Sequence, residues 1–197
     1  MRLPDHLGLA LLWRYSCHAI MLGLGLLAEP GAAPRLADAV LDAVPRIDWI
    51  AANNYWLWLA AYLPVALWLW RVDRGRFIEF LWVGGALSLV RGVCLPLTGL
   101  GPTDGLNPNA GLLGVQAWAA WLDLINPLSA LRGAAQVHLT KDLFFSGHTA
   151  STFLLWLYCR DLPRIGPVAL VAHLLVVAVV FTAHLHYAID VVGAWAI

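Results

Sequence analysis

The sequence predicts an all-α, polytopic membrane protein with six membrane-spanning helices, and three observations support this fold class. Hydrophobic residues make up 61% of the 197 residues and charged residues only 12%, whereas about a quarter of the residues in soluble domains are charged. Several apolar runs approach the roughly 20 residues that a helix needs to cross a bilayer. The formal net charge is zero, so no basic surface for nucleic acid is present. We therefore expect one membrane-embedded domain over residues 1–197.

The expected spans follow the apolar runs. They cover residues 7–27, 50–70, 77–97, 143–159 and 165–184, and a last segment begins near His186. That last run is too short to cross a bilayer by residue 197, so we expect the last helix to continue beyond this sequence. A cleaved signal peptide competes for the first run, but Arg14 and His18 interrupt its apolar core, which favours a span.

A shorter helix is expected between the third and fourth spans. Residues 101–141 contain the apolar run GLLGVQAWAAWL. This run is short for a span and suits an interfacial or re-entrant helix that ends at Asn126-Pro127.

The arginines of two short loops predict the orientation. The loops RVDRGR and CRDLPR hold five arginines between them, and short loops rich in Lys and Arg are typically cytoplasmic. The amino terminus is then cytoplasmic, and the outer ends of spans three to six lie on the exoplasmic side. The low Lys content and the bias toward Ala, Arg, Leu and Trp indicate a GC-rich bacterial source, whose inner membrane would have this side facing the periplasm.

This topology brings three distant features to the outer side. Arg91 lies near the outer end of the third span, SGH begins the fourth, and HLHYAID joins the fifth to the sixth. His186 and Asp190 are four residues apart, so on a helix they share one face. A carboxylate there fixes the imidazole tautomer and leaves the other nitrogen free to attack phosphorus. Ionisable side chains at membrane depth usually mark function.

The SGH motif supplies the second group of candidates. His148 is suited to donate a proton to a leaving alkoxide and to recover it from the next acceptor. Ser146 and Gly147 open a helix, whose first amides form a natural anion site. Arg91 can bind two phosphate oxygens with its planar guanidinium. Pairing of Arg91 with Asp142 is the structural alternative, and both arrangements can hold in turn.

Other polar residues are expected to play supporting roles. Lys141 and Asp142 precede the SGH motif and are placed to line a headgroup entrance, where Asp142 could tune the charge of His148. Arg14 and His18, at helical spacing, predict a polar contact inside the membrane, with a functional role as the alternative.

No cofactor and no metal are expected. The sequence holds no HExxH, no CxxC, no Gly-rich phosphate loop and no carboxylate cluster typical of a magnesium site. The three cysteines are an odd number and are expected to be small buried side chains rather than a disulfide framework.

The motifs SGHT and HYAID together resemble the active-site pair of the type 2 phosphatidic acid phosphatases and their sphingomyelin-synthase-like relatives. The resemblance implies a six-helix membrane fold with an exoplasmic site. It further implies a nucleophilic histidine oriented by an aspartate, and a first histidine that acts as acid. On this sequence these are His186, Asp190 and His148.

Several details resemble the sphingomyelin-synthase branch more closely. Residues 142–149 match D-x-x-x-S-G-H-T, and residues 186–191 match H-Y-x-x-D-V, which includes Tyr187. Arg91 and Leu100 follow the spacing of an Arg/Thr/Leu-Pro motif, although Cys94 stands where Thr is usual.

The expected function is that of a lipid phosphotransferase with a phosphohistidine intermediate. A phospho-headgroup would pass from a glycerophospholipid donor to a ceramide-like acceptor or another lipid alcohol, such as diacylglycerol. A lipid phosphatase or phospholipase C-type hydrolase with the same residues is the alternative, although Val180 stands where the phosphatase branch has an Arg. A non-catalytic lipid-binding or transport protein is a further alternative, and assembly as a homo-oligomer is left open. The sequence does not specify the headgroup.

Overall fold

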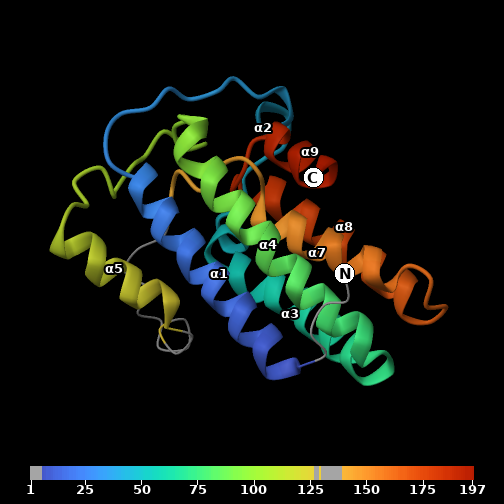
Figure 1. Ribbon diagram of the computed structural model, residues 1–197. Helices are drawn as coiled ribbons and strands as arrows, with labels where there is room; N and C mark the ends of the chain where they lie inside the picture. Colours follow the sequence, from blue (N-terminus) through green and yellow to red (C-terminus); the bar gives the residue numbers. More distant parts are fainter. Residues whose placement is uncertain (1–5, 127–128, 130–138) are drawn as a thin grey trace.

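The computed structural model describes residues 6–126, 129 and 139–197, and these residues form helices and loops without any strand. This confirms the predicted all-α class. The helices in Figure 1 are α1 (Leu7–Ala28), α2 (Ala39–Ala43), α3 (Asp48–Val72), α4 (Arg74–Thr98), α5 (Val115–Ile125), α7 (Gly147–Cys159), α8 (Ile165–Thr182) and α9 (Ala188–Ala196).

Three of these helices, α1, α4 and α8, are long and apolar enough to cross a membrane. They agree with the predicted membrane protein. Helix α3 is 25 residues long, but Asn53, Asn54 and its many Trp and Tyr residues lower its mean hydropathy. Helices α7 and α9 have 13 and 9 residues, so at 1.5 Å per residue each is shorter than the bilayer core.

Helix α7 begins four residues later than predicted. The sequence favoured a helix from residue 143, because Leu143 and Phe144 are apolar. The Ser146 hydroxyl instead accepts a hydrogen bond from the Thr149 amide at 3.3 Å and caps the helix. The Ser146 amide donates to the Asp190 carbonyl at 3.0 Å. These contacts hold residues 141–146 as a non-helical segment that leads into α7.

Helices α1 and α4 run in the same direction and lie side by side (Figure 1). Glycines of α4 allow the close approach. A Cβ on Gly92 would lie 3.0 Å from the Met21 Cα, and one on Gly85 would overlap the Trp13 ring. Small residues at such positions let two membrane helices pack through their backbones. This contact fixes the side chains of α1 relative to those of α4.

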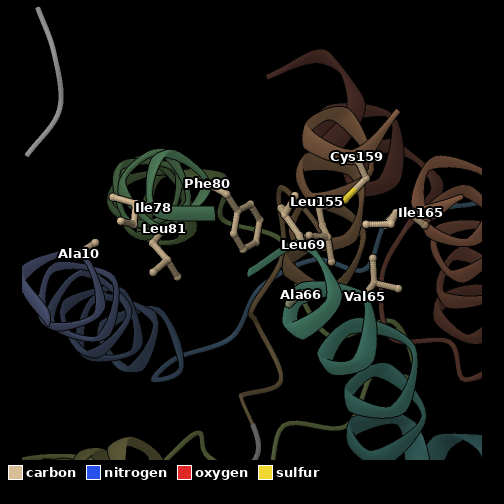
Figure 2. Packing of buried hydrophobic residues seen from close by; sticks show 11 residues of the cluster. Ala10, Val65, Ala66, Leu69, Ile78, Phe80, Leu81, Leu155, Cys159 and Ile165 are labelled. Atoms are coloured by element: carbon tan, nitrogen blue, oxygen red, sulfur yellow. The ribbon is translucent and has the colours of Figure 1, made fainter. Parts of the chain in front are cut away.

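The largest apolar cluster joins α3, α4, α7 and α8. Figure 2 shows the Phe80 ring of α4 pointing toward Leu69 of α3 and Leu155 of α7. Cys159 is buried in the same cluster and carries a free thiol. The cluster holds these helices together at a distance from the ends that carry the candidate site.

Helix α5 packs antiparallel to α1. The Trp121 indole donates to the Ala19 carbonyl at 2.7 Å, and the Tyr15 hydroxyl donates to the Ile125 carbonyl at 2.8 Å. The helix ends at Ile125, directly before the predicted stop at Asn126-Pro127. The two contacts lie about one turn apart on each helix.

A buried histidine connects α7, α8 and α9. The Trp195 indole can only donate, so its 3.0 Å hydrogen bond makes the His173 Nε2 an acceptor. The proton of the neutral ring is then on Nδ1, which faces the Thr152 hydroxyl at 2.9 Å. Thr152 in turn donates to the His148 carbonyl at 3.0 Å. The three helices are thereby held in register behind His148.

Replacement of Gly92 by Leu tests the α1–α4 contact. The larger side chain has no room beside Met21, so we expect a loss of about 1–3 kcal/mol of stability. Thermal unfolding of the purified protein in detergent micelles measures the effect. Gly8→Leu is the matched control, because a Cβ at Gly8 meets nothing within 4 Å. Equal unfolding temperatures for both variants would contradict the packing described.

Candidate active site

Residues from α4, α7 and the start of α9 meet at the end of the bundle where α1 and α4 finish and α7 begins. Arg91 comes from the last two turns of α4, His148 from the first turn of α7, and His186 from the turn between α8 and α9. The rings of His148 and His186 have their centroids 6.4 Å apart. The structure thus brings together side chains that are more than 90 residues apart in the sequence.

Asp190 is the fully buried acid of this group. One carboxylate oxygen accepts a hydrogen bond from the Phe144 amide and the other from the Tyr187 amide, both at 3.0 Å. The second oxygen also lies 3.4 Å from the His186 Nδ1. Charge-assisted hydrogen bonds of this kind stabilise a carboxylate away from water. The His186 ring therefore lies with Nδ1 toward the Asp190 carboxylate, although Nδ1 makes no hydrogen bond in the described structure, and with Nε2 away from it.

The two histidines differ in accessibility. His186 is 3% exposed, whereas His148 is half-buried. The His148 ring also contacts the Trp58 indole of α3 edge to face, at 5.6 Å between centroids. This aromatic wall limits the orientations that the His148 ring can adopt.

Arg91 is 5% exposed and reaches the non-helical segment before α7. Its Nε donates to the Phe145 carbonyl at 2.7 Å, and its Nη2 lies 2.7 Å from an Asp142 carboxylate oxygen. Its Nη1 contacts the Met21 sulfur at 3.1 Å. The predicted pairing with Asp142 is therefore present. One N–H of Nη1 has no oxygen partner among the described residues.

Asp142 is held in its ionised form by this pairing. Burial opposes the charge, but the Arg91 guanidinium more than offsets burial, so the pKa of Asp142 lies below its usual value. Asp142 is thus charged at neutral pH and occupies the Nη2 side of the guanidinium.

The start of α7 is shaped by Gly147. A Cβ there would lie 2.9 Å from the Arg91 Cζ, so only glycine leaves room for the guanidinium. Among the described residues, no protein acceptor is bonded to the Gly147 or His148 amide. These amides are the unpaired donors of a helix amino terminus next to a cation.

The remaining predicted residues cap α7 or join the loops next to the site. The Ser146 hydroxyl, predicted to hold phosphate, is fully buried and caps α7. The Lys141 Nζ donates to the carbonyls of Pro30 and Gly31. The Tyr187 hydroxyl donates to the Gly101 carbonyl at 2.9 Å.

Two buried or partly buried acids near the site escaped the sequence reasoning. Glu29, which is 0% exposed, accepts hydrogen bonds from the Asn109 side chain, the Thr140 amide and hydroxyl, and the Lys141 amide. Asp38 caps α2 and accepts from the Ala188 amide at the start of α9. The only sequence signal for Glu29 is a lone acid between an apolar run and Pro30. Trp58 gave no signal, because its role depends on tertiary packing.

Two cavities open beside the site rather than between the histidines. One of about 260 Å³ is lined by Leu95, Lys141 and Leu143, among others, and one of about 400 Å³ by Ala33, Asn107 and Lys141, among others. They share Lys141 and border the segment that leads into α7.

No protein-family model matches this chain, and a comparison with curated proteins found no match either.

Replacement of Asp190 by Asn tests the carboxylate contacts. An amide can accept from only one of the two backbone N–H groups and turns a donor toward the other. We expect a loss of about 1–3 kcal/mol of stability, because a buried donor is left without a partner. Thermal unfolding is the measurement, and Asp48→Asn, whose side chain is 94% exposed, should unfold like the wild type. An Asp190→Asn variant as stable as the wild type would show that the contacts are dispensable.

Proposed function

We propose that this protein is a lipid phosphotransferase that moves a phospho-headgroup between lipids through a phosphohistidine. The observation that carries the proposal is the pair of imidazoles from two separate chain segments, with centroids 6.4 Å apart and one of them backed by a buried carboxylate. That separation lets both rings reach a single tetrahedral phosphoryl group from opposite sides. The motifs shared with sphingomyelin-synthase-like enzymes support the same chemistry.

The reaction proceeds in two steps. In the first, the His186 Nε2 attacks the phosphorus of a glycerophospholipid, the bond to the diacylglycerol oxygen breaks, and protonated His148 gives its proton to that oxygen. In the second, a lipid alcohol such as ceramide gives its proton to His148, its oxygen attacks phosphorus, and the bond to His186 breaks. Asp190 stabilises the positive charge on the His186 ring throughout.

The phosphoryl oxygens are held by cationic and amide donors. The unpaired Nη1 hydrogen of Arg91 and the amides of Gly147 and His148 lie at one corner of the site. Negative charge that develops during transfer is stabilised by such preorganised donors. When the phosphate binds, the Asp142 carboxylate moves away from the guanidinium. Asp142 and the phosphate therefore bind Arg91 in turn.

The arrangement in the membrane follows from the same proposal. The bundle has six membrane segments with a cytoplasmic amino terminus, and the histidine pair lies on the exoplasmic side. Helix α5 is a re-entrant helix between the third and fourth segments, supported by its antiparallel packing on α1 as far as Tyr15. The arginine-rich loops after α3 and α7 support the orientation.

A lipid hydrolase is the second candidate. It is favoured by the half-buried His148, which water can approach in place of an alcohol. Access of water to the phosphohistidine decides between the two reactions.

Headgroup-labelled phosphatidylcholine or phosphatidylethanolamine in liposomes tests the proposal, with and without ceramide. We expect label on a new lipid only when ceramide is present. His186→Ala removes the nucleophile and should lower the rate about 1,000-fold or more. His6→Ala, at an exposed position before α1, should leave the rate unchanged.

The products distinguish the candidates. Label released into water, dependent on His186, would make the protein a hydrolase. Turnover that is absent, or equal in His186→Ala, would refute catalysis by this site and leave a lipid-binding or transport role.

A further inference from the structure

A second set of polar groups lies inward from the candidate active site, between α1 and α4. Arg91 contacts Met21 at the level of the site. One turn further inward, the Arg14 Nη1 donates to the Ser88 hydroxyl at 2.6 Å. Because α1 and α4 are parallel, Arg14 lies below Arg91 along the same helix pair. The rise of 1.5 Å per residue puts this level about 5–10 Å inward.

Arg14 has no carboxylate within ion-pair distance among the described residues. Its partner Ser88 is uncharged, and the Ser88 hydroxyl donates its own hydrogen bond to the Gly84 carbonyl at 3.1 Å. A charged guanidinium inside a membrane span is costly without polar partners. Because the Ser88 hydrogen bond uses one N–H of Arg14, the other N–H groups are open to another acceptor.

His18 lies beside Arg14 on the same face of α1, four residues along the helix. Its side chain is exposed, although α1 is packed against α4. The His18 imidazole is therefore open to a ligand beside Arg14.

We propose that Arg14 and His18 form a subsite for the carbonyl oxygens of a lipid backbone. This proposal rests on the proposed function and names which part of the substrate is held. With the phosphoryl group at Arg91 and the headgroup outward, the ester-linked glycerol must lie inward, toward the bilayer centre. Its carbonyl oxygens then reach the level of Arg14, whose free N–H groups can donate to them. An amide carbonyl of a sphingolipid-type acceptor occupies the same place in the second step.

The test compares two donors with the same headgroup, one with ester-linked and one with ether-linked chains. Ether lipids lack the carbonyl oxygens. In the wild type, kcat/KM for headgroup transfer should be about tenfold or more higher with the ester donor, since a charged donor gains a hydrogen bond. In Arg14→Met this ratio should fall to about one, because ester turnover falls and ether turnover is kept. Retained ether turnover also shows that the variant is folded.

Matched variants complete the experiment. Arg46→Met removes an arginine whose side chain is 42% exposed and should keep the wild-type ratio. If Arg14→Met does not fold, Arg14→Gln retains a donor for Ser88, and its ratio decides in the same way. A wild-type ratio in the folded Arg14 variant, or no preference in the wild type, would overturn the subsite while the transferase stands. No transfer from either donor would instead overturn the proposed function, and the subsite with it.

Discussion

The structure around the candidate site depends on the buried Asp190 carboxylate. A charge with no access to water is tolerated only when hydrogen bonds satisfy it. Asp190 obtains two of them from backbone amides, at Phe144 and Tyr187, and its own carbonyl accepts from Ser146. The segment before α7 is thus fastened to the start of α9. The positions of both candidate histidines follow from this attachment, because each lies within a few residues of a fastened amide.

A similar principle organises the loops above the site. Glu29 and Asp38 turn their oxygens toward backbone amides of distant segments rather than toward lysines or arginines. Glu29 fixes Lys141, one residue before the acid that pairs with Arg91. These loops are therefore joined mainly by hydrogen bonds to backbone amides, which depend less on salt than exposed ion pairs do.

Much of the helical framework could be predicted from the sequence. The ends of α1 agree with the apolar run within a residue, because that run is bounded by polar residues and no tertiary contact competes with it. The start of α7 could not be predicted, because it depends on Ser146, whose amide is bonded by a residue 44 positions away. The spacing of His186 and Asp190 revealed the candidate pair. The contributions of Trp58 and Glu29 come from packing between distant segments, which no local pattern records.

The connection between Asp190 and residues 144–146 also has a consequence for the order of assembly. Asp190 comes later in the chain than every other residue of the candidate site, so the segment before α7 is synthesised before its carboxylate partner. Until then the amides of Phe144 and Ser146 lack these partners, whereas the Lys141 amide and the Phe145 carbonyl can already bond Glu29 and Arg91. Docking of the start of α9 is therefore the step that fixes the segment before α7 and, with it, the positions of the two histidines relative to each other.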